Sequence, residues 1–171
     1  MQKKSEQFEK RAIMAHFLAA VAYRTQKALQ GAPESFANFR AREGVRTPHE
    51  LIQHMTSVLG YARTFFVGGN WRPERLPTFD AEIRRFHEIL ESLRDHLLSD
   101  EPLREVSFEQ LLQGPLADAM THAGQLALLR RLHGHPVPPE NFVYADISST
   151  NLGPNQPPPA RPDKEWKEPK G

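Results

Sequence analysis

Four stretches of the chain repeat apolar residues every three or four positions, and glycine or proline follows each of them. This spacing places the apolar side chains on one face of an α-helix, so each stretch predicts an amphipathic helix. Glycine and proline end such helices, because glycine is conformationally free and proline lacks an amide donor. The predicted helices cover about residues 5–30, 47–67, 78–98 and 116–132.

Capping signals support this division. The run Thr-Pro-His-Glu at 47–50 has the pattern of a capping box with proline at the first helical position. Ser107 is a similar cap for a short helical turn, which Gly114 and Pro115 should end or kink. No segment alternates with period two, so we expect no sheet. The predicted fold class is all-α, an up-and-down four-helix bundle over residues 1–147, with room for an extra turn or a crossover in its first connection.

The composition changes after His135, because nine of the 15 prolines lie between Pro136 and Pro169. A stretch this rich in proline cannot continue the bundle as a helix. Its first half contains apolar residues at 142–147, enough to lie along the bundle, whereas the end is polar. We therefore predict a bundle domain that ends at 147 and an extended or mobile Pro-rich C-terminal tail over 148–171.

Length, charge and cysteine content narrow the function classes. The 171 residues suffice for one domain, and 22 Lys and Arg against 21 Asp and Glu create no broad field for nucleic acid or an anionic membrane. The N-terminus is charged and no run approaches the roughly 20 apolar residues that cross a bilayer, so we expect a cytoplasmic protein. The chain has no cysteine, so a bound metal must use nitrogen and oxygen ligands.

His54 lies on the apolar face of the second predicted helix. At about 100° per residue it shares an arc with Leu51, Val58, Tyr61 and Phe65. A buried imidazole must bind a metal, be hydrogen-bonded or lie at a wet edge, since leaving it unsatisfied costs on the order of 1–3 kcal/mol. Core histidines that are satisfied structurally are common, so His54 by itself does not establish a ligand.

Asp118 and His122 are four residues apart on the fourth helix, so they share one face, and Gln125 follows on the same arc. A surface pair of carboxylate and imidazole is the plain alternative. Together with His54, these residues supply two imidazoles and one carboxylate from two facing helices, and such a set leaves coordination positions open. We predict that His54, Asp118 and His122 bind zinc, nickel, iron or manganese, because calcium and magnesium prefer more oxygen ligands.

The other histidines receive structural interpretations. By its spacing, His16 lies on the inner face of the first helix, where it lines the same cavity or packs in the core. We expect His49, His87 and His96 to be solvated, and His133 and His135 to lie at the negative end of the fourth helix. The chain has no convincing acid/base pair of carboxylates, no phosphate loop and no nucleophile elbow, so no catalytic residue is predicted.

Over roughly residues 8–147, this pattern resembles the DinB/YfiT-like superfamily of metal-binding four-helix bundles. The resemblance rests on His54, on the run Asp118-Ala-Met-Thr-His122-Ala-Gly-Gln125-Leu, and on residues 129–137, which look like the superfamily's usual helix ending. It implies that His54 and His122 are metal ligands, with Asp118 in a third place where many members have histidine. Members are often homodimers, so the resemblance also implies a homodimer.

The resemblance implies a function that depends on the metal. The superfamily includes thiol-dependent S-transferases and maleylpyruvate isomerases, and its better understood members use the metal to ionise the thiol of a low-molecular-weight cofactor. We therefore expect a metal-dependent transferase or hydrolase in which metal-bound water or thiolate attacks a small electrophile. Two alternatives stay open. One is a non-catalytic metal- or small-molecule-binding module related to stress response, and the other is a structural bundle whose tail contacts a partner.

Overall fold

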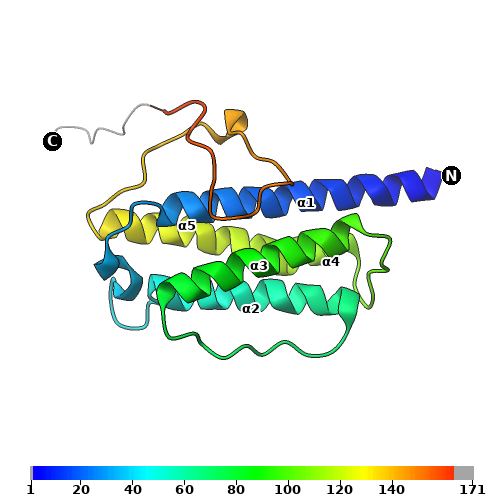
Figure 1. Cartoon of the computed structure of the whole chain (residues 1–171), viewed down its shortest axis with the longest axis horizontal. Helices are drawn as coiled ribbons and strands as arrows, with labels where there is room; N and C mark the ends of the chain where they lie inside the picture. Colours follow the sequence, from blue (N-terminus) through cyan, green and yellow to red (C-terminus); the bar gives the residue numbers. More distant parts are fainter. Residues whose placement is uncertain (1, 164–171) are drawn as a thin grey trace.

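The structure, a computed structural model, describes residues 2–163, and their side chains from residue 6 onward. Over these residues the protein is all-α and has no β-strand (Figure 1). Four long helices form a bundle, and short helical turns lie in the connections. No described helix is long and apolar enough to cross a bilayer. The long helices are α1 (Gln2–Leu29), α2 (Pro48–Val67), α3 (Phe79–Leu98) and α5 (Ala117–Leu132), and the short ones are η1 (Glu34–Asn38), α4 (Phe108–Leu111), η2 (Leu112–Leu116) and η3 (Phe142–Tyr144).

Helix α2 begins and ends where the sequence predicts. The hydroxyl of Thr47 accepts from the amide of Glu50, and the carboxylate of Glu50 accepts from the amide of Thr47, which completes the capping box. The helix ends at Gly68, whose φ of 77° lies in the region that favours glycine. Both ends of the helix that carries His54 are therefore fixed locally.

The kink predicted near Gly114 and Pro115 is the π-helical turn η2 between α4 and α5. Ser107 and Gln110 form a capping box for α4. Gly114 has φ −90° and ψ −105°, outside the helical region, and the chain then enters α5 at Ala117. This break sets the direction of the helix that carries the other two candidate ligands.

The long helices do not alternate in direction, so the predicted up-and-down order is wrong. At the start of α2, the ring of His49 is 5.7 Å from the ring of Phe79 at the start of α3. Near their ends, the ring of Phe66 stacks on His96 at 5.8 Å. Helices α2 and α3 therefore run parallel, and the loop between them returns along the length of the bundle (Figure 1).

The loop at 68–78 is long enough for this crossover. Its eleven residues can span roughly 36 Å when extended, whereas a helix of 20 residues is roughly 30 Å long. The indole of Trp71 lies against Gly60 of α2, so close that a Cβ on Gly60 would be 2.1 Å from the indole nitrogen. The first connection, for which the sequence allowed an extra turn or a crossover, contains the extra turn η1.

Helices α1 and α5 run parallel on the other side of the bundle. The guanidinium of Arg130 in α5 is buried and donates to the carbonyls of Ala28 and Gln30 at the end of α1. Helices α3 and α5 each pack on both α1 and α2, which closes the four-helix arrangement. Large buried side chains from all four helices and from η1 fill the core: Leu18, Tyr23, Phe36, Ile52, Met55, Phe66, Phe86, Leu90 and Leu126.

The C-terminal segment crosses α1 on its outer side (Figure 1). The carboxylate of Glu140 is buried there, where it accepts from the hydroxyl of Tyr23 at 2.7 Å and pairs with the ammonium group of Lys27. The ring of Phe142 meets the ring of Tyr23 edge to face, with centroids 6.2 Å apart. This part of the segment therefore makes specific contacts with the bundle.

The same segment adds one residue to the core beyond the predicted domain end. Leu152 is 1% exposed, and its carbonyl accepts from Nδ1 of His87 at 2.6 Å. The boundary at 147 and the mobility of the tail at 148–171 stay predictions. The end of that tail, 164–171, lies outside the described residues.

Candidate metal centre

His54, Asp118 and His122 meet where α2 packs against α5. His54 lies in the N-terminal half of α2, and the other two residues lie one turn apart near the start of α5. One potential ligand atom from each residue lies within 4.8 Å of the other two. The structure therefore brings together all three predicted ligands, in a cluster that could hold a metal ion.

Asp118 lies between the two imidazoles. Its Oδ2 is 3.3 Å from Nε2 of His54, and its Oδ1 is 3.4 Å from Nε2 of His122. In a tetrahedral site with bonds of about 2.1 Å, ligand atoms are about 3.4 Å apart. Both separations are close to that value, although they use different oxygens of Asp118, so each imidazole nitrogen lies at a suitable distance from the carboxylate. The chemistry of two imidazoles and one carboxylate also suits zinc and its neighbours among the transition metals.

Gln125 orients His122. Its Oε1 lies 2.8 Å from Nδ1 of His122, which is one turn earlier in the same helix. An amide oxygen accepts only, so Nδ1 carries the proton and Nε2 keeps a lone pair that faces the cluster. Metal-binding histidines are usually held in this way by a second hydrogen bond. The helical spacing predicts Gln125 on the same arc as the site, and its role as the partner of His122 becomes visible in the structure.

The cluster has a buried side and an exposed side. The side chain of His122 is 9% exposed, that of His54 is 30% exposed, and that of Asp118 is 43% exposed. An ion held by these three residues would keep its open coordination positions on the solvent side, where a small molecule can reach them.

The surroundings favour neutral His54. Burial is the main cause that lowers the pKa of its imidazole, followed by the positive charge of Arg46 and the proximity of His122. The carboxylate of Asp118 acts in the opposite direction but is outweighed. Since a metal binds neutral imidazole, the lowered pKa keeps His54 in its ligand form at neutral pH.

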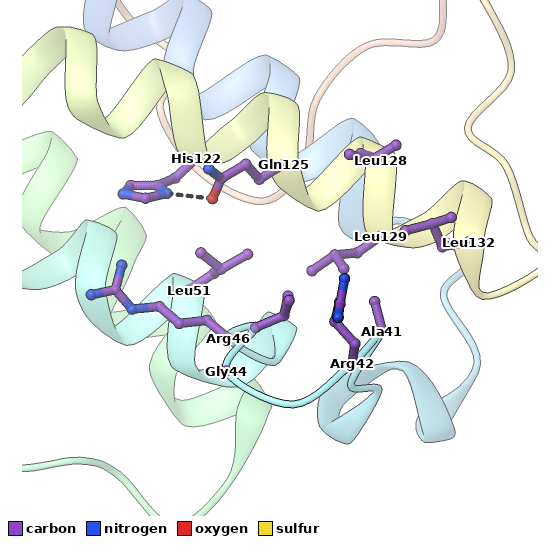
Figure 2. A pocket seen from close by; sticks show the side chains of 11 residues that line it. Ala41, Arg42, Gly44, Arg46, Leu51, His122, Gln125, Leu128, Leu129 and Leu132 are labelled. Carbon is purple, nitrogen blue, oxygen red and sulfur yellow. Dashed lines mark hydrogen bonds between the residues drawn. The ribbon is translucent and has the colours of Figure 1, made fainter.

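Two cavities flank the cluster. One, of about 720 Å³, reaches His122, and the other, of about 450 Å³, reaches His54. The loop residues Gly44, Val45 and Arg46 line both cavities. Figure 2 shows the larger cavity, with the His122–Gln125 hydrogen bond at one end. Space for a small molecule therefore lies beside both imidazoles.

His16 is not part of this site, contrary to expectation. It is exposed on α1 and is absent from the residues that line either cavity. His49 and His87 are buried rather than solvated, and His96 is partly buried with its ring stacked on Phe66.

These differences arise from contacts between segments far apart in the sequence. Nδ1 of His49 lies 3.1 Å from the guanidinium of Arg75, which comes from the crossover loop. His87 is covered by the C-terminal segment through Leu152. Burial lowers the pKa of both imidazoles. The periodicity of one helix cannot reveal a partner that a distant loop supplies.

The histidines at the end of α5 match their prediction in position. His133 is the C-cap residue of α5, and its ring packs against the rings of Phe36 and Phe39. Its Nδ1 lies 3.1 Å from Nδ1 of His135. Both residues lie at the negative end of the helix, where a cation or hydrogen-bond donor is stabilising.

Comparisons of the chain with models of known protein families, with curated proteins and with solved structures gave no match. What can be concluded about the site therefore comes from its own residues and their geometry.

Proposed function

We propose that the chain is a DinB/YfiT-like protein that binds one divalent ion of zinc, nickel, iron or manganese through His54, Asp118 and His122. The observation that carries this proposal is the meeting of the three side chains, which offer one ligand atom each within 4.8 Å of the others. The two carboxylate oxygens of Asp118 lie 3.3 and 3.4 Å from the imidazole nitrogens of His54 and His122. The hydrogen bond from Gln125, which turns Nε2 of His122 toward the other donors, supports it.

The arrangement suits a metal-dependent transferase or hydrolase that acts on a small electrophile. A divalent ion lowers the pKa of a water molecule or a low-molecular-weight thiol that it binds, which makes a nucleophile at neutral pH. The chain's own residues would hold the inner side of the ion through His122 and Gln125. The exposed side, next to Asp118, would receive the thiol or water, and the flanking cavities would receive the electrophile.

The experiment combines metal loading with two reactions. Zinc-, nickel-, manganese- and iron-loaded protein would be mixed with glutathione and 1-chloro-2,4-dinitrobenzene, and separately with 4-nitrophenyl acetate. We expect at least one reaction to exceed the metal-free rate, and Asp118→Ala to remove the excess. Metal binding with no excess rate in either reaction would contradict the catalytic part of the proposal.

A non-catalytic metal-binding module is the second candidate, and one observation favours it. Among the described residues that line the two cavities, the sole carboxylate is Glu50, and it is occupied by Arg40 and by the cap of α2. No separate acid or base therefore stands ready beside the cluster. Bound metal without turnover would select this candidate.

The homodimer, which the resemblance suggests, and the cytoplasmic location complete the proposal. Light scattering on the purified protein tests the first, and a mass of one chain would contradict it.

A further inference from the structure

The larger cavity combines an apolar wall with positive charge. Its wall includes Leu51, Leu128, Leu129 and Leu132, and two arginines stand at its rim (Figure 2). Leu128 and Leu132 are 55% and 57% exposed although they are large apolar side chains. Exposed leucines that border a cavity present a surface on which the apolar part of a ligand can pack.

The two arginines, Arg42 and Arg46, belong to the loop that precedes α2. Within the described part of the chain, neither guanidinium makes a hydrogen bond or an ion pair. In Figure 2, Arg46 extends toward the end of the cavity where His122 lies, and Arg42 stands toward Leu129 and Leu132. Both guanidinium groups are thus available to a ligand.

A third arginine in the same loop provides the contrast. Arg40 donates to the carbonyl of Val45 and pairs with the carboxylate of Glu50, so its charge is already matched. Arg40 does not line the larger cavity, and neither does Glu43, the acidic residue of the loop. The unmatched positive charge of the loop therefore lies at this cavity.

We propose that this cavity binds a small amphiphilic anion, a carboxylate or phosphate monoester with an apolar body, through Arg42, Arg46 and the leucine wall. Guanidinium groups match both kinds of anion, and the leucines select for the apolar body. The inference rests on the proposed function, because it names the class of substrate that would meet the metal at the His122 end. A volume of about 720 Å³ falls within the range of small-molecule sites.

The test is a titration followed by methyl and arginine side-chain NMR, on metal-free and zinc-loaded protein. The probes are hexanoate and hexyl phosphate, with hexanamide and acetate as controls for charge and apolar body. We expect at least one anionic probe to shift the methyl signals of the cavity leucines, with affinity about tenfold or more above both controls. Arg42→Gln/Arg46→Gln should remove this advantage, whereas Arg40→Gln should keep it. All three substitutions, in these two variants, change exposed side chains, and the spectra show directly whether the fold is kept.

The outcomes separate this inference from the proposed function. Zinc binding without binding of either anionic probe would overturn the inference and leave the metal site in place. Binding of an anionic probe by a protein that takes up no metal would support the inference and overturn the proposed function. Binding that needs zinc and survives Arg42→Gln/Arg46→Gln would assign the anion to the metal and overturn the role of the arginines.

Discussion

The buried histidine under the C-terminal segment and the buried histidine between α2 and α5 differ in the partners of their ring nitrogens. Under the C-terminal segment, His87 is 3% exposed, with Nδ1 donating to the carbonyl of Leu152 and Nε2 3.3 Å from the side-chain amide of Gln26. Between α2 and α5, His122 has an acceptor for Nδ1 alone, and its Nε2 faces a carboxylate beside an open cavity. The ring of His87 is therefore enclosed by protein, whereas Nε2 of His122 faces another potential ligand that is itself 43% exposed.

This difference provides a criterion for distinguishing structural from functional histidines in a helical bundle. Burial alone does not do so, since both residues are buried. The criterion is whether both ring nitrogens have protein partners or whether one points at other potential ligands on an accessible side. By that criterion His54 and His122 are the candidate ligands that we propose, whereas His87 has the contacts of a structural residue.

Replacement of His122 should have the largest effect. We expect His122→Ala to lower zinc affinity by more than about 100-fold, because removal of a ligand costs more than removal of its orienting partner. Competition with a chromophoric chelator measures this affinity. His16→Ala removes an exposed imidazole elsewhere and should leave the affinity unchanged. Equal zinc affinity in the two variants would contradict the assignment of His122 as a ligand.

Replacement of Glu140 tests the contacts between the C-terminal segment and α1. Glu140→Ala leaves the buried hydroxyl of Tyr23 and the ammonium group of Lys27 without their acceptor, and should lower the free energy of unfolding by about 3 kcal/mol. Urea denaturation of the metal-free protein measures it. Zinc affinity should stay within about twofold of the native value, since ΔΔG values at separated sites are nearly independent. A loss of zinc affinity together with the loss of stability would show that the contacts of Glu140 and the candidate metal centre are coupled.

Gln125→Ala should weaken the metal site without affecting the fold. We expect a loss of about 10–100-fold in zinc affinity, because His122 loses the acceptor that fixes its ring. Gln125 is exposed, so the urea midpoint of the metal-free protein should hardly move. Unchanged zinc affinity would mean that Gln125 does not orient the ligand.

Substitutions at two glycines test the packing of the crossover loop on α2. Gly60→Ala would place a methyl group into the indole of Trp71 and should cost about 2 kcal/mol of unfolding free energy. Gly124→Ala on α5 meets nothing within 4 Å and should instead stabilise the protein by about 0.5–1 kcal/mol. Opposite signs in urea denaturation support the packing of the loop on α2, and a stabilising Gly60→Ala would contradict it.

The smallest effect is a dependence of stability on pH. Burial lowers the pKa of His87, so on acidification the unfolded chain binds a proton near pH 6.5 while the folded chain does not. The free energy of unfolding should therefore fall as the pH drops from 7 toward 5, by about 1.4 kcal/mol for each unit of pKa lowering. With metal removed by EDTA, His87→Gln should show a shallower slope. An unchanged slope would place the titration on His49 and His54, whose pKa values are also lowered.

Local signals predicted the helices and the meeting of the candidate ligands. Thr47 and Ser107 form the caps that the sequence indicates, and the spacing of Asp118 and His122 on the fourth helix brings both to the face opposite His54. The caps and the shared face of Asp118 and His122 depend on residues within a few positions of one another, which is the range that periodicity and capping describe. The approach of His54 to them depends on the packing of α2 against α5.

The direction of α3 and the burial of His87 could not be predicted from such short-range signals. Both depend on distant packing, of Trp71 on Gly60 and of Leu152 on the bundle, and neither contact leaves a periodic pattern. The anion-binding role that we propose for Arg42 and Arg46 could not be predicted from the sequence either. Which arginines of the loop lack a partner is visible only once the loop is placed against α2 and α5.

The most direct test of the metal site is elemental analysis of the untagged protein beside His54→Ala, after exposure of both to zinc, nickel, manganese and iron and removal of loosely bound ions. We expect about one metal ion per native chain and far less in the variant. No metal in the native protein, or equal metal in both proteins, would contradict it.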